Sequence, residues 1–243
     1  MRSDLRAFGR LLTVQASWNY ERMAGIGLGY ATEPLLTDLA QSDPSRVGDA
    51  TRRATGFFNS HPYLAGVAAG AEARAEYDGV DGGQVERLRA ALSSPLGALG
   101  DQLFWAGVWP ALLGVALIAV ALGAGWAVPV AAVAVMLVVR LRMTRWSLRT
   151  GLRSGMQVGA ALQHTRLRSL IPGFGLAAAF AVGAAVPLVA REAAGVRGWP
   201  AAVAAAVAVA GVAVGQRRLV RLTGVGFGLA AFAVVILVRL AVG

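Results

Sequence analysis

Residues 105–125, WAGVWPALLGVALIAVALGAG, carry no charged side chain along their whole length. A helix of about 20 such residues is long enough to cross the hydrocarbon core of a membrane. Further apolar runs follow at 126–139, 170–190, 199–215 and 223–242. Hydrophobic residues make up 56% of the chain, more than a typical soluble domain contains. The sequence therefore predicts an integral membrane protein whose C-terminal region, 105–243, holds four or five hydrophobic helices.

The second run, 126–139, is short for a helix that crosses a membrane. It is compatible with a tight hairpin, with a re-entrant segment, or with a span that extends to about residue 143. The number of full spans depends on which of these forms.

Charge is unevenly divided along the chain. Residues 1–101 hold 12 of the 13 acids and 10 arginines, whereas residues 102–243 hold one acid, Glu192, and 13 arginines. Because the C-terminal arginines lie between apolar runs, membrane lipid phosphate is their expected partner, and nucleic acid is not. The positive-inside rule places the arginine-rich loops at 140–168 and 216–222 in the cytoplasm. Alternation of the spans then puts the N-terminus in the cytoplasm and the C-terminus outside.

Residues 1–104 form a second region, predicted to be helical because no strand-like alternation occurs in it. Asp43 precedes a proline and marks the start of a helix through 44–58. A further helix is expected over 62–77, and a short amphipathic one over 84–92. The N-terminus shows no cleavable apolar core, so no signal peptide is expected. The fold class is therefore all-α.

The segment QASWNYERMAGIGLGY, residues 15–30, mixes hydrogen-bonding side chains with glycines. A helix through it places Gln15, Asn19 and Arg22 on one side and Glu21 on another. Because polar groups at membrane depth usually pair with each other, the segment is predicted to organise a subunit contact or the core of the molecule; direct contact with a ligand is the lesser alternative. The residues assigned this role are Gln15, Trp18, Asn19, Glu21 and Arg22. The glycines at 25, 27 and 29 are interpreted as close-packing positions.

Two other segments contain candidate ligand-binding residues. In FFNSHPYLA, Asn59 and His61 lie near aromatic rings and could hydrogen-bond a sugar, although helix capping alone also explains Asn59. In SSPLGALGDQLFW, a proline and two glycines predict an irregular backbone before Asp101. Asp101 is either the N-cap of the following helix or part of a site near the membrane, and the two roles are compatible.

Several kinds of chemistry are excluded by residue content. The chain has no cysteine and no lysine, which removes thiolate metal sites, cysteine nucleophiles and phosphate loops of the lysine type. Two histidines alone do not build a metal site, and no Ser–His–Asp or paired-carboxylate motif is visible. We therefore expect no catalytic residue, no metal, no cofactor and no enzyme activity of the chain on its own.

Taken together, three blocks resemble one family. QASWNYERMAGIGLGY (15–30), GFFNSHPYLAG (56–66) and SPLGALGDQLFWAGVWP (94–110) have the order and spacing of the IID component of the mannose/fructose/sorbose-type bacterial phosphotransferase system. The weaker segment VVRLRMTRWSLRTGLRSG (138–155) also fits. The resemblance covers nearly the whole chain.

The resemblance implies a multi-pass subunit of the bacterial inner membrane that pairs with a IIC subunit to bind and translocate a mannose-type hexose. Cytoplasmic IIA and IIB phosphocarriers would relay phosphate to the sugar, and the IID chain would not itself be phosphorylated. It also implies that part of the N-terminal half is re-entrant or membrane-associated, and that IIC–IID pairs form an oligomer. Sugar contact is expected from Asn59, His61 and Asp101, and contact with IIC from the 15–22 segment.

The sequence departs from the family pattern in two ways. Ser94 replaces a usual glycine and Gln102 a usual proline, and the region after residue 155 is short. The alternative hypothesis is therefore a divergent IID-like scaffold with a structural or regulatory role and no sugar transport.

Overall fold

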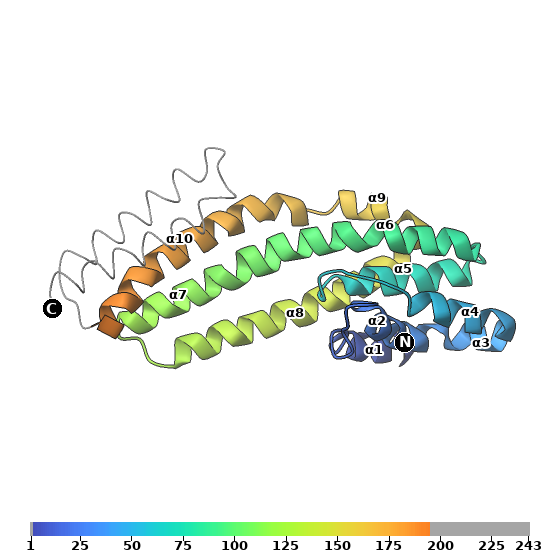
Figure 1. The fold of residues 1–243 in the computed structure, drawn as a ribbon, viewed down its shortest axis with the longest axis horizontal. Coiled ribbons are helices and arrows are strands. Elements are labelled where there is room, and N and C mark those ends of the chain that lie inside the picture. Colours follow the sequence, from blue (N-terminus) through green and yellow to red (C-terminus); the bar gives the residue numbers. More distant parts are fainter. Residues whose placement is uncertain (1, 195–243) are drawn as a thin grey trace. The chain divides into compact units, whose positions relative to one another are not determined.

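The structure of the chain is a computed structural model, and it describes residues 2–194. Regular secondary structure in this part is helical, and two isolated bridges are its only β-type pairings. The all-α prediction is confirmed for these residues. The elements in chain order are α1 (Arg2–Leu11), α2 (Gly25–Thr32), η1 (Glu33–Leu36), α3 (Thr37–Ser42), α4 (Pro44–Ala54), α5 (Ala65–Tyr77), α6 (Gly82–Gly100), η2 (Asp101–Val108), α7 (Trp109–Ala121), α8 (Ala127–Ser154), η3 (Gly155–Gln157), α9 (Val158–Gln163) and α10 (Leu167–Ala194) (Figure 1).

The described chain forms two compact units. Unit 1 contains residues 2–102 and 137–168, so the arginine-rich segment predicted as a loop folds together with the N-terminal region. Unit 2 contains residues 103–136 and 169–194. Each unit has its own packing and is described separately.

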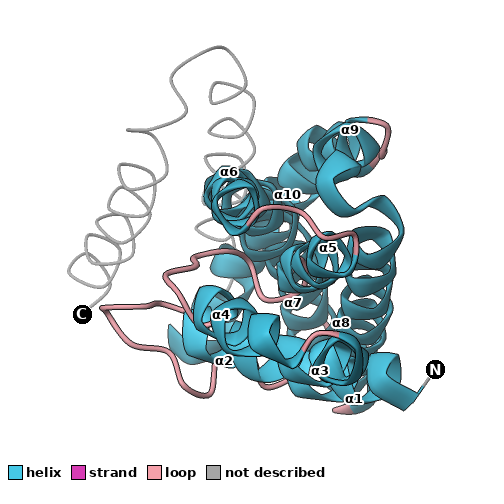
Figure 2. Cartoon of the chain, turned by 90° about the vertical axis from the view of Figure 1, so that its right-hand side faces the viewer, coloured by secondary structure: helices cyan, strands magenta, loops and turns pink. Residues whose placement is uncertain are grey.

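Helix α5 is the centre of unit 1. Figure 2 shows it enclosed by other helices of the unit, and it contacts α1, α2, α4, α6 and η3. Its sequence, AGVAAGAEARAEY, consists mostly of alanine and glycine, and nearly every side chain from Ala65 to Glu76 is buried. A helix with buried residues on all faces needs small side chains so that its neighbours can approach from every direction.

Glycines bring α5 and α8 into backbone contact. A Cβ added to Gly70 would lie 2.6 Å from the carbonyl oxygen of Leu148, and one added to Gly151 would lie 2.3 Å from that of Val67. Real side chains do not tolerate such distances, so both positions require glycine. The buried face of α8 is thereby fixed against α5.

Unit 2 shows the same device between α7 and α10. A Cβ on Gly114 would lie 2.8 Å from the Cβ of Ala181. Large apolar side chains such as Val115, Val133 and Phe180 are more than half exposed on this unit. Exposed apolar surface along long helices is what a lipid environment requires.

Within residues 2–194, three helical stretches are long and apolar enough to cross a membrane: Gly82–Ala121, Ala127–Gln163 and Leu167–Val186. The first and third overlap most of the predicted runs at 105–125 and 170–190. The segments 199–215 and 223–242 lie outside the described residues.

The run 126–139 contains no turn of its own after residue 126, and the short segment 122–126 joins it to α7. The run belongs to the continuous 28-residue helix α8. Of the three alternatives, the extended span is nearest to the structure, and the helix continues beyond residue 143. The prediction of a short helix over 84–92 was wrong, because α6 runs from Gly82 to Gly100. Leu92 and Leu96 are buried at helical spacing, and their packing favours continuation of the helix despite Pro95.

Candidate functional site

Three segments distant in sequence meet in unit 1: the loop 12–24, the extended segment 56–64 and the C-terminal end of α6. Backbone hydrogen bonds join the first two. The N–H of Ala24 donates to the carbonyl of Phe58 at 3.0 Å, and the N–H of Phe58 donates to the carbonyl of Arg22 at 3.3 Å. Phe58 is fully buried beneath this pairing. The residue blocks 15–30 and 56–66 are therefore parts of one substructure.

The 12–24 loop is not helical, contrary to the expectation. Helix α1 ends at Leu11 and turns follow until α2 begins at Gly25. The Oδ1 atom of Asn19 accepts hydrogen bonds from the backbone N–H groups of Glu21 and Arg22, at 3.1 and 2.9 Å. These bonds compete with helical ones, which explains why the helix does not form. Met23 has φ = 52°, an unusual backbone conformation for a bulky residue.

The loop presents several polar and aromatic side chains to the exterior. Trp18 and Tyr20 stack edge to face with ring centroids 4.9 Å apart, and Tyr20 is 86% exposed. Gln15, Glu21 and Arg22 are also exposed. Of the residues assigned to a subunit contact, Asn19 holds the turn of the loop through its Oδ1 atom, and Trp18 stacks on Tyr20.

The 56–64 segment lies along α6 at positions with small side chains. The Ser93 hydroxyl accepts from the backbone N–H of Asn59 at 3.0 Å and donates to its carbonyl at 2.8 Å. One turn later Gly97 lies near the same carbonyl, and Gly100 follows. Ser93, Gly97 and Gly100 are spaced by four and three residues, so they share one helix face. This face receives the 56–64 segment.

His61 fills the end of that face. A Cβ on Gly100 would lie 2.1 Å from the Cβ of His61, so the imidazole packs directly on the helix backbone. The His61 side chain is 1% exposed, its Nδ1 accepts from the N–H of Tyr63 at 3.2 Å, and the Tyr63 ring stacks edge to face against it. Burial lowers the pKa of His61 from 6.5 to about 4, so its imidazole is neutral at physiological pH.

Asp101 directly follows Gly100 and is exposed. The prediction that it caps the next helix was wrong, because the helix is continuous: the backbone N–H of Asp101 donates to the carbonyls of Gly97 and Ala98. The prediction of an irregular backbone before Asp101 was also wrong, because α6 is regular as far as Gly100; the π-helix η2 begins at Asp101. Wide helical turns of this kind are frequent at functional sites. Along the last turns of α6, Asn59 thus lies against Ser93, His61 lies against Gly100, and Asp101 follows Gly100 directly.

The glycines of α2 serve close packing, as predicted. A Cβ on Gly25 would lie 1.9 Å from the carbonyl oxygen of Gly56, and one on Gly27 would lie 2.0 Å from that of Val14. A Cβ on Gly29 would collide with Thr55. These contacts hold the 12–24 loop and the start of the 56–64 segment against α2.

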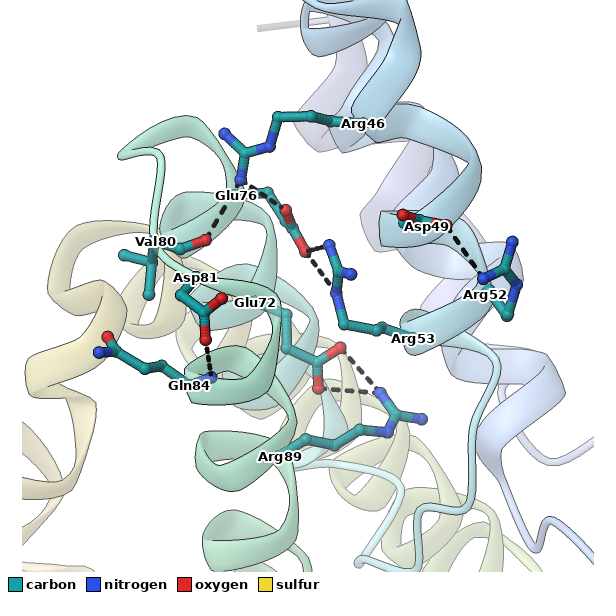
Figure 3. A network of polar contacts seen from close by, with 10 residues as sticks. All are labelled: Arg46, Asp49, Arg52, Arg53, Glu72, Glu76, Val80, Asp81, Gln84 and Arg89. Atoms are coloured by element: carbon teal, nitrogen blue, oxygen red, sulfur yellow. Dashed lines mark hydrogen bonds and ion pairs between the residues drawn. The ribbon is translucent and has the colours of Figure 1, made fainter.

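A buried ion-pair network behind this region was missed in the sequence (Figure 3). Arg89 on α6 donates from Nη1 to both carboxylate oxygens of Glu72 on α5, at 2.8 and 2.9 Å. Its Nη2 and Nε donate to the carbonyls of Gly56 and Phe57. Arg89 therefore ties α5 and α6 to the beginning of the 56–64 segment. Burial raises the pKa of Glu72 to about 7, and the charge of Arg89 opposes this shift.

A second carboxylate, Glu76, extends the network to α4. It pairs with Arg53 at 2.6 Å and with Arg46 at 3.1 Å. Asp49, four residues before Arg53, pairs instead with the exposed Arg52. The sequence signal for this network is the pair Glu72 and Glu76, two acids four residues apart in a helix that consists mostly of small residues.

A polar cavity of about 350 Å³ adjoins the network. It is lined by Asp49, Arg52, Arg53, Gly56, Phe57, Glu86 and Arg89. Since Arg53 and Arg89 are paired with carboxylates, the cavity is interpreted as part of the structural network. No three His, Asp or Glu side chains within residues 2–194 converge to hold a metal ion.

The chain is similar to known proteins in sequence and in fold. The family model described as "PTS system mannose/fructose/sorbose family IID component" matches residues 2–192. The chain is 30% identical over 177 residues to the fructose permease IID component of Bacillus subtilis (strain 168), which covers 70% of this chain and 63% of that protein. It is 29% identical over 196 residues to the mannose-specific EIID component of Escherichia coli (strain K12), covering 76% and 67%. The match thus spans about two-thirds of the length of these relatives.

Two solved structures are also similar. One, described as the structure of a membrane protein, has a TM-score of 0.64 and 28% identity, covering 76% of this chain and 70% of that chain. The other is a cryo-electron microscopy structure of the mannose transporter ManYZ in complex with microcin E492, with a TM-score of 0.56, 27% identity, and coverage of 77% and 70%.

Proposed function

Because the chain belongs to the mannose/fructose/sorbose family of phosphotransferase-system IID components, we propose that it acts as the membrane IID subunit of a hexose permease. It pairs with a IIC subunit to bind and translocate the sugar, and cytoplasmic IIA and IIB partners carry out the phosphoryl transfer. The observation that carries the proposal is the convergence of three sequence blocks on one end of α6. Similarity to a chain of the mannose transporter ManYZ supports it.

We assign sugar contact to Asn59 and Asp101. Both side chains are exposed at the same end of α6, and the backbone of Asn59 is held there by Ser93. An amide and a carboxylate offer the donors and acceptors that sugar hydroxyls need. His61 is the third expected site residue; because it is buried, its proposed role is to position the 56–64 segment against Gly100.

The 12–24 loop is the proposed contact with IIC. Its stacked pair, Trp18 and Tyr20, is exposed in this chain. Large aromatic side chains of this kind are enriched in the cores of protein interfaces, so their exposure favours a partner here. Glu21 and Arg22 add charged groups of both signs next to this pair. Gln15 lies at the beginning of the loop, and Asn19 holds its turn in shape.

We further propose an inner-membrane location with the N-terminus in the cytoplasm. Residues 122–126, between α7 and α8, carry no charge, whereas 140–168 carry seven arginines and no acid. This asymmetry supports a cytoplasmic location for the 140–168 end of the spans. Continued alternation through the remaining apolar runs puts the C-terminus outside.

The test is copurification of the tagged chain with its membrane partners, followed by sugar binding to the complex that is recovered. The proposal expects a stoichiometric IIC-type partner and saturable hexose binding. Replacing Tyr20 by Ser should release the partner, and Asn59→Ala should abolish sugar binding while the partner is retained. Trp126→Ala, at an equally exposed aromatic residue between α7 and α8, is the matched control and should change neither.

Recovery of the chain alone, without hexose binding, would reject the permease function in favour of the divergent scaffold motivated by Ser94 and Gln102. Normal uptake by both Asn59→Ala and Asp101→Ala would reject the site assignment while leaving the subunit assignment in place.

A further inference from the structure

The exposed face of α8 changes from apolar to basic between Val138 and Arg142. Along this face the positions follow each other at spacings of three or four residues, as one side of a helix requires. The first exposed residues in the series are apolar: Ala131, Val135 and Val138. The next exposed residues are all arginine: Arg142, Arg145, Arg149 and Arg153. We call these four the arginine row.

The orientation of the arginine row is fixed by the opposite side of the helix. Thr144 and Ser147 are 1% and 0% exposed, and Gly151 is in backbone contact with α5. Because this contact leaves no room for rotation of α8, the four guanidinium groups stay on the outside of unit 1.

The row has no partner among the described residues. No ion pair joins any of its members to a carboxylate there, although Arg46, Arg53 and Arg89 of the same unit are all paired. Arg140 precedes the row and is engaged differently, since it donates to the carbonyl of Leu12 and lies over the Tyr63 ring. Four aligned cations that are not ion-paired with a carboxylate attract an external anion.

The position of the row favours lipid phosphate as that anion. Side chains on a helix tilt toward its N-terminus, and the N-terminal part of α8, as far as Val139, is the apolar part. The guanidinium groups therefore lean toward the membrane. Guanidinium groups bind phosphate oxygens through two parallel hydrogen bonds.

We propose that Arg142 and Arg145 bind the phosphate groups of anionic phospholipids at the membrane surface where α8 leaves the hydrocarbon. The headgroup layer is about 5–8 Å thick on each side of a bilayer. Arg145 lies about 4.5 Å beyond Arg142 along the helix axis, Arg149 about 10 Å and Arg153 about 16 Å. Arg149 is thus just beyond the layer, and Arg153 is well outside it.

The test measures binding of phosphatidylglycerol to the full chain in neutral detergent micelles, together with any subunit that copurifies. Arg145→Gln should weaken binding roughly fivefold, and Arg142→Gln with Arg145→Gln more than tenfold. Arg153→Gln removes the same charge from the same face and should change binding less than twofold. Phosphatidylcholine should bind weakly, and free inorganic phosphate should not compete.

Because all four side chains are exposed, the variants should keep the melting temperature of the parent. Equal losses for Arg145→Gln and Arg153→Gln would overturn the proposal, as would competition by inorganic phosphate or equal binding of phosphatidylcholine. Unchanged lipid binding combined with loss of an acidic protein partner from the purified complex would assign the row to that protein.

Discussion

The guanidinium group of Arg89 and the carboxylate of Glu72 form a two-bond ion pair in which both side chains are at least 94% shielded from solvent, at 6% and 3% exposure. Removing two charges from water is costly, and such a pair is stable only when its remaining donors also find acceptors. Arg89 satisfies this condition through the carbonyls of Gly56 and Phe57. The pair therefore couples the central helix of unit 1 to the segment that carries Asn59 and His61.

Replacing Arg89 by Leu should destabilise the protein by about 3–5 kcal/mol, because the Glu72 carboxyl is left buried without its partner. A thermal unfolding series in detergent measures this loss. Arg52→Leu is the control: Arg52 is 79% exposed and pairs with an exposed Asp49, so its loss should lower the melting temperature very little. Equal melting temperatures for the two variants would contradict the structural role of the buried pair.

Gly100→Ala should displace His61 and reduce sugar uptake, because the new methyl group would lie 2.1 Å from the His61 Cβ. Such overpacking costs about 1–3 kcal/mol. Gly97→Ala, one turn earlier on the same face, meets its nearest atom at 3.7 Å and should leave uptake and stability near the parent values. The idea fails if the two alanine variants behave alike in uptake and in thermal unfolding.

The contribution of His61 to stability should fall as the pH is lowered from about 6.5 to about 4, whereas the raised pKa of the buried Glu72 acts in the opposite direction. The pKa of His61 is 6.5 when the chain is unfolded and about 4 when the imidazole is buried, so within this window protons bind the unfolded chain preferentially. The full effect is about 3 kcal/mol, and it is absent above pH 6.5. Melting temperatures of the parent and of His61→Asn, measured across this window, isolate the contribution. A parallel decline in both proteins would assign the pH dependence to other groups.

In unit 2, Gly114→Ala should loosen the packing of α7 on α10, because its Cβ would lie 2.7 Å from the backbone of Ala181. Gly175→Ala, on α10, meets nothing within 4 Å and should be neutral or slightly stabilising, since alanine favours a helix over glycine by up to about 1 kcal/mol. Thermal unfolding of both variants gives the comparison. A stabilised Gly114→Ala protein would show that the contact is not tight in the folded chain.

Helix content and close-packing glycines could be predicted from the sequence because both depend on local patterns. The apolar run at 105–125 and the glycines at 25, 27 and 29 have direct physical consequences for any helical chain. The resemblance of three sequence blocks to one family also pointed to the segments that meet at the end of α6. Confirmation of the family followed from the match over residues 2–192.

The loop at 12–24 and the ion pairs could not be predicted in the same way, because they depend on competition and on partners distant in sequence. Asn19 is compatible with a helix, but its side chain can also accept hydrogen bonds from nearby backbone N–H groups. The backbone pairing of Arg22 and Ala24 with Phe58 favours the second arrangement. Arg53 had an acid four residues before it, yet it pairs with Glu76 on another helix. Local spacing carries no information about that choice.

The burial of α5 on all sides has a consequence for the order of events during synthesis. Glycines of this helix pack on α8, whose residues 148–152 emerge from the ribosome only after about 70 further residues, including a membrane-length apolar run, have been made. At roughly 5–20 residues per second, the delay is on the order of 4–15 seconds. Unit 1 therefore lacks the α8 side of its core until residues 148–152 have been made. This late segment completes the unit that carries the proposed site.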